Sequence, residues 1–258
     1  MISKLAVVSP QAEIAEGVVI EQFSTIYEDV KIGKGTKIGP NVVIYPGTRI
    51  GENCEIYPGA VIGAAPQDLK FAGEYTTCEI GNNTIIRECV TIHRGTSDKM
   101  TTKVGDNCLL MGYVHVAHDC IIGNNVILAN YTGLSGHNII EDYAILEGKV
   151  GTQQFIRVGA HAFVAGASLI RKNVPPFIRV AREPLTFAGV NAIGLRRRGM
   201  TDEQIKNVED IYRILFVLNN NMSKAIAQIL EEIPPCKERD QVLQFIEESD
   251  KGIVRGPM

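Results

Sequence analysis

Histidines are few in this chain, and most of them lie close together. Four of the five fall in the middle of the sequence: His93, His115, His118 and His137. A carboxylate, Asp119, follows His118 directly. An imidazole beside a carboxylate is suited to proton transfer, because the carboxylate orients the ring and stabilises its protonated form. The fifth histidine, His161, lies further along the chain. The spacing therefore indicates acid–base chemistry, provided that the fold brings these residues to one edge.

A six-residue repeat is the element that would position them. Every sixth residue from Ile2 to Ile170 is aliphatic at 25 of 29 positions, the exceptions being Asp68, Glu74, Asp98 and Thr152. A small or β-branched residue stands four positions later in many hexads, as at Thr36. This period is typical of a parallel β-solenoid, in which three hexads close one coil and the aliphatic residue points inward.

Residues three hexads apart lie above one another in such a coil. Gly136 then lies beneath His118, Gln154 beneath Gly136, and His137 beneath Asp119. If the hexad that begins at Asp98 is left out of the coil count, all four central histidines gather on one edge. A glycine leaves its backbone N–H open, which suits an oxyanion donor. We therefore interpret His118, Asp119 and Gly136 as a catalytic group. A zinc site that uses His115 and His118 is the alternative, as in the trimeric β-helix carbonic anhydrases.

Two stretches interrupt the repeat. Residues 64–79 and 98–103 lack the inward aliphatic residue and are predicted to be loops, which collect on the binding face of a solenoid. Pro175-Pro176 is expected to end the β-helix, because prolines cannot serve the ladder. We predict a β-helix over residues 1–178, a linker to about Pro184, and a helical domain over residues 185–258.

Three helices are expected in that domain. Thr201 to Gln204 form a capping box for a helix to about Leu218, Ser223 can cap a second to Ile233, and a third runs over residues 237–248. The helices would cover the open end of the β-helix. A basic cluster suits a phosphate or an acidic protein, or is solvated surface: Arg179, Arg182, Arg196, Arg197, Arg198 and Lys206.

Bulk properties narrow the class of protein. The 258 residues carry a net charge of −3, which argues against general nucleic-acid binding. No apolar run is long enough to span a bilayer, so an integral membrane protein is not expected. The first repeat begins at residue 2, so we expect no signal peptide and a cytoplasmic location.

Three of the six cysteines, Cys54, Cys108 and Cys120, occupy the small inward positions, as packed reduced thiols would. The other three cysteines show no metal or redox spacing: Cys78, Cys89 and Cys236.

Five motifs carry a more specific likeness: residues 66–74 (PQDLKFAGE), 92–96 (IHRGT), 115–120 (HVAHDC), 189–191 (GVN) and 194–199 (GLRRRG). They resemble the bacterial UDP-N-acetylglucosamine O-acyltransferases, and the likeness covers essentially the whole chain. The resemblance implies a left-handed β-helix with a C-terminal α-helical domain. It also implies a homotrimer with sites between subunits. The implied reaction moves an (R)-3-hydroxyacyl group from acyl carrier protein to the glucosamine 3-hydroxyl of UDP-N-acetylglucosamine, the first step of lipid A biosynthesis. No metal or coenzyme is implied beyond the phosphopantetheine of the carrier.

The resemblance also implies roles for single residues. His118 matches the general base, Asp119 the group that orients it, and the Gly136 N–H the oxyanion donor. Gly166 matches a position that limits acyl length. The positions expected to bind substrate are Gln67, Asp68, Lys70, His93, His115, His137, Gln153, Gln154, Asn191, Arg197 and Arg198.

Two departures from the family pattern bear on nucleotide binding. Gln153 stands where a histidine is common, and Ile193 where a glutamate is frequent. The alternative functions are another hexapeptide-repeat acyltransferase, dependent on acetyl-CoA or acting as the N-acyltransferase of the same pathway, and a non-enzymatic or metal-based use of the β-helix. The N-acyltransferase would be expected to carry a further N-terminal domain.

Overall fold

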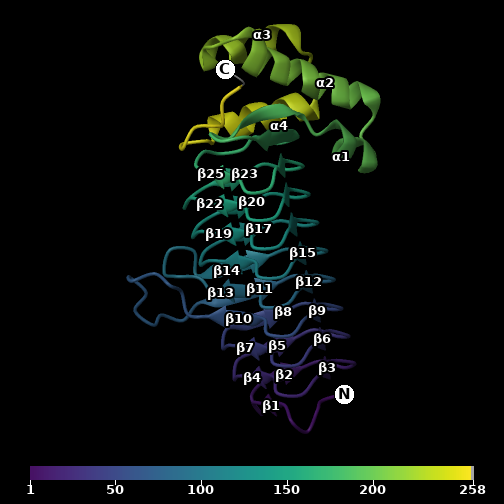
Figure 1. The fold of residues 1–258 in the computed structure, drawn as a ribbon, viewed down its shortest axis with the longest axis vertical. Helices are drawn as coiled ribbons and strands as arrows, with labels where there is room; N and C mark the ends of the chain where they lie inside the picture. The colour runs from purple at the N-terminus through teal and green to yellow at the C-terminus, as the bar shows by residue number, and fades with distance from the viewer. Residues whose placement is uncertain (257–258) are drawn as a thin grey trace.

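The computed structural model describes residues 1–256 as a tall prism of stacked coils with helices at its C-terminal end (Figure 1). Three sheets form the faces of the prism, with nine, eight and ten strands. Within the first two sheets and most of the third, neighbouring strands are parallel, so the chain winds as a β-helix.

Most strands are only two residues long, and their bounds follow the hexads. The nine-stranded sheet contains β1 Val7–Val8, β4 Thr25–Ile26, β7 Val43–Ile44, β10 Val61–Ala64, β13 Thr91–His93, β16 His115–Val116, β19 Gly133–Leu134, β22 Gly151–Thr152 and β25 Leu169–Ile170. The eight-stranded sheet contains β2 Glu13–Ile14, β5 Lys31–Ile32, β8 Thr48–Ile50, β11 Thr77–Ile80, β14 Thr101–Val104, β17 Ile121–Ile122, β20 Ile139–Ile140 and β23 Arg157–Val158. The ten-stranded sheet contains β3 Val19–Ile20, β6 Lys37–Ile38, β9 Glu55–Ile56, β12 Ile85–Ile86, β15 Leu109–Leu110, β18 Ile127–Leu128, β21 Ile145–Leu146, β24 Phe163–Val164, β26 Ile178–Ala181 and β27 Thr186–Val190.

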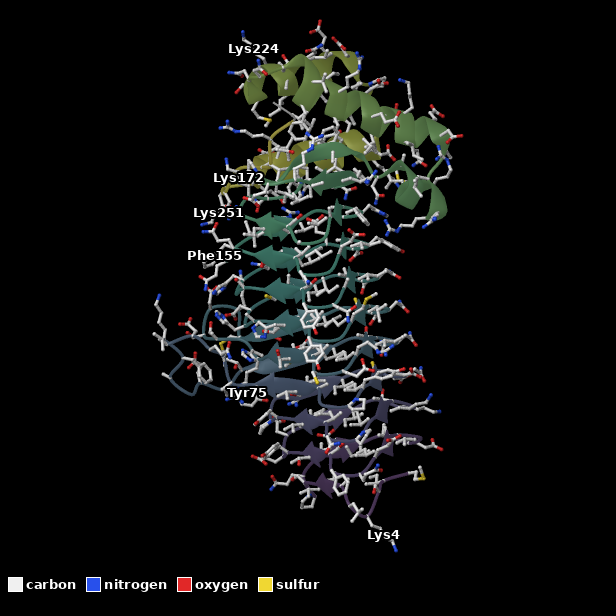
Figure 2. All side chains as sticks on the ribbon, viewed as in Figure 1. Lys4, Tyr75, Phe155, Lys172, Lys224 and Lys251 are labelled. Carbon is white, nitrogen blue, oxygen red and sulfur yellow. The ribbon has the colours of Figure 1, made fainter. Side chains whose placement is uncertain are left out.

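The inward aliphatic column forms the core, as the repeat predicts. From Ile20 to Ile170 its members are at most 4% exposed, and successive coils stack like on like, as Ile26 does on Ile44. Burying one such side chain stabilises the fold by roughly 1.5–3 kcal/mol relative to leaving it exposed. Most charged side chains stay outside, as Lys4, Lys172 and Lys251 show in Figure 2.

The small inward register has a second task that the sequence did not reveal. The Thr36 hydroxyl donates to the Gly51 carbonyl at 2.8 Å and accepts from the Cys54 N–H at 3.0 Å, so it joins two coils at a corner. Thiols replace hydroxyls elsewhere: Cys54 Sγ lies 3.0 Å from the Gly81 carbonyl, and Cys108 Sγ 3.1 Å from that of Gly123. These residues are therefore small and also polar enough to satisfy the corner backbone.

The first excursion is shorter than expected, and the second begins and ends earlier. Residues 65–76 leave the prism between β10 and β11, and residues 94–100 leave it between β13 and β14. The prediction missed residues 94–97 of the second loop, and it was wrong for residues 64, 77–79 and 101–103, which are strand. Their inward positions are filled by Cys78 and Thr102, both 0% exposed, and a count of aliphatic residues alone misses them. Both loops protrude from the same edge of the prism (Figure 1).

The β-helix also continues further than the prolines suggested. Beyond Pro175-Pro176, β26 pairs in parallel with β24, and β27 returns antiparallel beside β26, so the first half of the stretch expected as a linker is strand and the second half is the turn between β26 and β27. The two prolines occupy the turn between coils, where no ladder N–H is needed.

Four α-helices and one π-helix follow: α1 Ala192–Arg197, α2 Asp202–Arg213, η1 Ile214–Leu218, α3 Met222–Glu232 and α4 Lys237–Glu247. The capping box of α2 is confirmed, because the Thr201 hydroxyl accepts from the Gln204 N–H while the Gln204 side chain accepts from the Thr201 N–H. The cap predicted at Ser223 was wrong, since the Asn221 side chain begins α3 by accepting from the Lys224 N–H. The short helix α1 was not predicted. None of the helices within residues 1–256 combines the length and apolar character needed to cross a bilayer.

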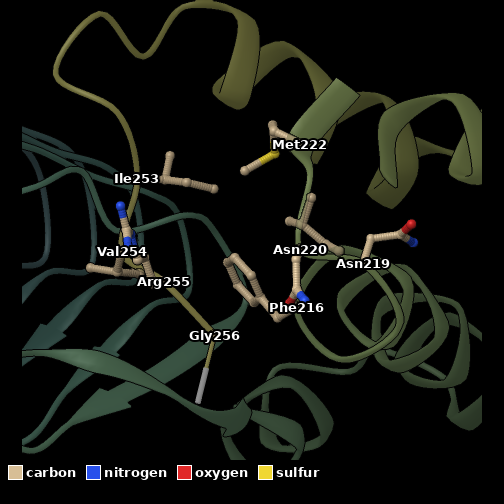
Figure 3. Close-up of a pocket in the computed structure, with 9 residues that line it drawn as sticks. Phe216, Asn219, Asn220, Met222, Ile253, Val254, Arg255 and Gly256 are labelled. Carbon is tan, nitrogen blue, oxygen red and sulfur yellow. The ribbon is translucent and has the colours of Figure 1, made fainter. Parts of the chain in front are cut away.

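The helices cover the last coils, as expected (Figure 1). The buried Tyr212 hydroxyl of α2 donates to the Pro176 carbonyl at 2.7 Å, and Arg157 of β23 lies over the Phe245 ring of α4. A hollow of about 480 Å³ lies between η1 and the C-terminal segment, and Phe216, Asn219 and Met222 line it (Figure 3). Its lining holds none of the residues expected in the active site.

The corner hydrogen bonds predict a specific sensitivity. Replacing Thr36 by Val keeps the volume but leaves the Gly51 carbonyl and the Cys54 N–H unpaired in the interior. We expect the free energy of unfolding in urea to fall by about 1–3 kcal/mol. The Thr36→Ser variant, which keeps the hydroxyl, is the control and should lose clearly less. Equal losses in the two variants would contradict this role of the hydroxyl.

Candidate active site

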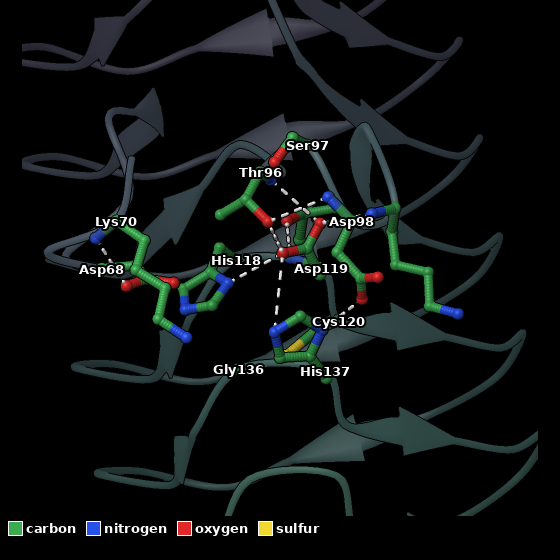
Figure 4. A network of polar contacts seen from close by, with 12 residues as sticks. Asp68, Lys70, Thr96, Ser97, Asp98, His118, Asp119, Cys120, Gly136 and His137 are labelled. Carbon is green, nitrogen blue, oxygen red and sulfur yellow. Dashed lines mark hydrogen bonds and ion pairs between the residues drawn. The ribbon is translucent and has the colours of Figure 1, made fainter. Parts of the chain in front are cut away.

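His118 and Asp119 form a buried pair at a turn between β16 and β17. Asp119 Oδ2 lies 2.8 Å from His118 Nδ1, and the two residues are 1% and 5% exposed (Figure 4). Asp119 adopts a φ of 59°, at a left-handed turn position that asparagine fills in several other coils. With the carboxylate at Nδ1, the neutral ring carries its proton there, and Nε2 is free to accept one.

The loop over residues 94–100 holds the Asp119 carboxylate. Thr96 donates to it twice, from its N–H at 2.9 Å and from its hydroxyl at 2.6 Å, and the Lys99 N–H adds a bond of 3.2 Å. Burial alone would raise the pKa of Asp119, but the hydrogen bonds from Thr96 and His118 outweigh burial and leave the pKa below its usual value. The carboxylate is therefore ionised and fixed at neutral pH.

Gly136 lies against the His118 ring on the next coil, as the column argument predicts. A Cβ atom at Gly136 would lie 2.7 Å from His118 Nε2 and 2.6 Å from Cε1, closer than any side chain tolerates. Among residues 1–256, no carbonyl or side chain accepts a hydrogen bond from the Gly136 N–H. The geometry therefore requires glycine and leaves one backbone donor open beside the free imidazole nitrogen.

The remaining histidines of the cluster surround this pair. The rings of His93 and His115 meet edge to face at 4.8 Å between centroids, and those of His118 and His137 at 5.0 Å. Burial, with repulsion from His115 and His118, lowers the pKa of His93 to about 4. Burial and His118 also lower the pKa of His115, whose Nδ1 contacts the Thr91 hydroxyl at 2.7 Å. The four histidines do gather on one edge, as the columns predict.

The residues expected on the first loop lie near this edge. Asp68 is half-buried and accepts a hydrogen bond from the Lys70 N–H at 2.9 Å, whereas the Gln67 and Lys70 side chains are exposed. Figure 4 places Asp68 and Lys70 on the same side as His118. On later coils, Gln153 and Gln154 are exposed, and His137 stacks on Phe155 at 4.4 Å.

A second cluster contains the residues expected at the nucleotide. The Asn191 side chain donates to the His161 carbonyl at 2.9 Å, and the Arg198 guanidinium lies 5.3 Å from the Tyr143 ring centroid. Arg196, by contrast, is paired with Asp202 at 2.7 Å. The side chain of Ile193 is 64% exposed. No contact within residues 1–256 joins this second cluster to His118, so the structure of one chain leaves the two sets apart.

The structure brings together a group of possible metal ligands other than the pair weighed from the sequence. The donor atoms of His118, Asp119 and His137 lie within 4.8 Å of one another, whereas the alternative considered from the sequence used His115 and His118. These donors fit a cation poorly, because the Asp119 carboxylate already accepts three bonds from Thr96 and Lys99 and a fourth from His118.

Three residues of the site escaped the sequence analysis. Thr96 and Thr102 bind Asp119, the latter by accepting from its N–H at 2.8 Å. The Asp98 carboxylate lies 3.0 Å from His137 Nδ1, although it is poorly aligned for a hydrogen bond. Thr96 lies within the motif of residues 92–96, and nothing else in the sequence pointed to it. Asp98 was recognised only as a break in the repeat.

The fold and this site together define a hexapeptide-repeat transferase. A family model described as bacterial transferase hexapeptide (six repeats) matches residues 29–64 and 101–136. Another, described as UDP N-acetylglucosamine O-acyltransferase, domain 2, matches residues 173–254.

Similar proteins cover nearly the whole chain. An acyl-[acyl-carrier-protein]–UDP-N-acetylglucosamine O-acyltransferase of Thiobacillus denitrificans is 44% identical over 97% of both chains, and one of Alkalilimnicola ehrlichii is 47% identical over the same shares. The crystal structure of a UDP-N-acetylglucosamine acyltransferase from Bacteroides fragilis is 47% identical, with a TM-score of 0.97 over 99% of this chain and 100% of that one. This chain belongs to the acyl-[acyl-carrier-protein]–UDP-N-acetylglucosamine O-acyltransferase family. The resemblance implied a left-handed β-helix for this family, and coils of opposite hand would not superpose with a TM-score of 0.97. The β-helix of this chain is therefore left-handed.

The low pKa of His93 predicts how stability depends on pH. An unfolded chain protonates this residue near pH 6.5, but the fold protonates it only near pH 4. The contribution of neutral His93 to the free energy of unfolding is therefore fully present above about pH 6.5, and it is lost as the pH is lowered towards 4. In His93→Gln this fall should be smaller, with Tm at pH 4.5 about 2–4 °C less depressed, the change expected for roughly 1 kcal/mol. Calorimetry from pH 4 to 7.5 measures it. Parallel curves for the two proteins would contradict the burial of a neutral His93.

Proposed function

We propose that this chain transfers an (R)-3-hydroxyacyl group from acyl carrier protein to the glucosamine 3-hydroxyl of UDP-N-acetylglucosamine. The observation that supports it most is the His118–Asp119 pair, with Nδ1 held at 2.8 Å and the opposite nitrogen facing Gly136. The names of the similar enzymes contain this donor and this acceptor. The reaction would open lipid A biosynthesis.

The chemistry follows from the geometry. His118 Nε2 removes the proton of the sugar 3-hydroxyl as that oxygen attacks the thioester carbonyl carbon. Asp119 stabilises the imidazolium that forms, and the Gly136 N–H donates to the oxyanion. When the C–S bond breaks, the imidazolium returns its proton to the thiolate of the carrier. Every atom and charge is accounted for by the two substrates and His118, so no metal or coenzyme is part of the proposal.

The proposal also assigns the residues that would contact the substrates. Asp68 and Lys70 would hold the polar groups of the acyl donor, with Gln67 beside them. The sugar and diphosphate would lie along His93, His115, His137, Gln153 and Gln154. The nucleotide would contact Asn191, Arg197 and Arg198, and the basic cluster would also face the acidic carrier protein.

We further propose a homotrimer that acts in the cytoplasm. In a single chain the histidine edge and the Asn191–Arg198 cluster are apart, so a neighbouring copy would have to supply a wall between them. Exposed aromatic side chains at the corners support such packing, since Tyr113, Tyr131 and Phe155 are 54%, 57% and 49% exposed. A reducing location is supported by the buried thiols, whose pKa burial raises to about 12 at Cys120.

Removing the base tests the function directly. With UDP-N-acetylglucosamine and 3-hydroxyacyl carrier proteins of several lengths, the wild type should form the 3-O-acyl product. In His118→Ala the turnover number should fall by about 10²–10⁴-fold, because general-base catalysis contributes that much. Circular dichroism controls for folding, and a zinc chelator should leave the wild-type rate unchanged.

The proposal fails if the wild type transfers no acyl group from any donor, or if His118→Ala turns over undiminished. Loss of activity with the chelator, together with bound zinc in the purified protein, would instead favour the metal site formed by His118, Asp119 and His137.

Gly166 is the position expected to limit the length of the acyl chain. It lies above Gly148, and a Cβ atom there would meet the Gly148 carbonyl at 3.2 Å, so this column presents bare backbone. In Gly166→Met the long side chain should block the far end of an acyl groove. The preferred donor should shift to a shorter chain, with kcat/KM for the wild-type optimum reduced about tenfold or more. Competition between donors measures the shift, with Gly166→Ala as the milder control. An unchanged preference in both variants would remove Gly166 from the acyl site.

A further inference from the structure

The two loops that leave the prism are joined to each other by one carboxylate. Glu74, near the end of the first loop, accepts from the Ala72 N–H of its own loop at 2.9 Å and from the Ser97 N–H of the second loop at 3.0 Å. Each oxygen binds one loop, so the side chain bridges the two excursions. Neither the repeat nor the roles expected from the family include this residue.

The second loop is the one that holds the catalytic carboxylate. Ser97 lies between Thr96 and Lys99, whose N–H groups both bind Asp119. The residue after Ser97, Asp98, lies 3.0 Å from the His137 ring. A displacement of Ser97 would therefore be transmitted to Asp119 within one peptide unit, and from Asp119 to His118 (Figure 4).

The first loop carries the residues expected at the acyl donor. Asp68 and Lys70 lie four to six positions before Glu74. The Arg94 guanidinium lies 5.4 Å from the Phe71 ring centroid, and its buried Nε has no hydrogen-bond partner within residues 1–256. Hydrogen bonds from the backbone of Glu74 itself, Ala72 and Ser97, with the Arg94 charge, lower the pKa of the Glu74 carboxyl. The bridge is therefore ionised at neutral pH.

We propose that Glu74 is a positioning residue, which couples the loop that grips the acyl donor to the loop that fixes Asp119. Its carboxylate touches neither the reacting atoms nor His118, and it acts through the backbone of residues 96–99. Seating of the donor on Asp68 and Lys70 and alignment of the base thereby depend on one another. This inference rests on the proposed acyl transfer for its catalytic consequence, but not for the coupling of the loops.

The chain offers a matched control in the neighbouring residue. The Tyr75 hydroxyl donates to Asp29 at 2.8 Å and ties the base of the same loop to the body of the prism, without contacting residues 94–100. The Glu74→Gln variant keeps the shape but offers one acceptor oxygen for two N–H groups. Tyr75→Phe removes a tie of the same loop that does not reach Asp119.

Steady-state kinetics and amide hydrogen exchange are then measured on wild type, Glu74→Gln, Glu74→Asp and Tyr75→Phe. For Glu74→Gln we expect kcat to fall about tenfold, a shift of the kcat/KM pH profile because Asp119 is displaced, and faster exchange over residues 94–100. Glu74→Asp, which keeps both acceptors, should recover part of the rate. Tyr75→Phe should change KM alone and leave exchange over 94–100 at the wild-type level.

The proposal is overturned if Glu74→Gln raises only KM, or if Glu74→Gln and Tyr75→Phe behave alike in exchange. An inactive wild type would defeat the proposed function and not this inference, because the exchange of residues 94–100 reports the coupling without turnover. Unchanged exchange in Glu74→Gln would defeat the coupling even if the wild type is active.

Discussion

Pairing of each coil with the next, in register, is the constraint on which the rest of this molecule depends. Val7 pairs with Thr25 and Thr25 with Val43, eighteen residues apart each time, so side chains of one column stack directly. A hexad strand of two residues buries too little surface to exist alone. It is stable only because the coils above and below supply both its hydrogen bonds and its packing. The inward aliphatic residues provide the packing between coils, and the corner hydroxyls and thiols provide hydrogen bonds between them.

The functional edge exists because this register tolerates insertions of particular lengths. Val61 pairs with Thr91, thirty residues on, and Thr77 with Thr101, twenty-four residues on, so the excess over one coil is twelve residues and then six. Both are whole hexads. The chain therefore returns to the same phase after each loop, and His115 to Asp119 keep the positions they would have in an unbroken prism. Loops of other lengths would rotate every later column against the earlier coils and separate His115 from Thr91, its partner in the preceding coil.

The six-residue period of the sequence was sufficient to predict which residues lie inside the prism and which residues of neighbouring coils stack on one another. It predicted the inward aliphatic residues, the contact of Gly136 with His118, and the gathering of the four histidines. It failed where the backbone leaves the repeat. Thr96, Asp98 and Glu74 act through loop conformations that no period describes, and Cys78 and Thr102 resume the coil without an aliphatic signal. β26 was missed because the proline pair resembles a terminus. Asn221, rather than Ser223, begins α3, and capping propensity does not distinguish two polar residues of similar rank that lie two positions apart. The roles of single residues came from the family motifs and not from the period.

Electrostatics explain why the loops matter more than their small size suggests. Four imidazoles lie in two contacting pairs on a partly desolvated edge, and burial and mutual repulsion lower the pKa of His93 and of His115. A base that gains a proton here needs a compensating negative charge. Asp119 is the carboxylate that contacts His118, and its ionised form is itself maintained by donors from residues 96 and 99. The β-helix can hold an imidazole above a glycine, but it provides only one donor to the buried Asp119 carboxylate, the His118 ring, and lacks the three others. The inserted loop supplies them, so the catalytic pair of this prism depends on a segment outside the repeat.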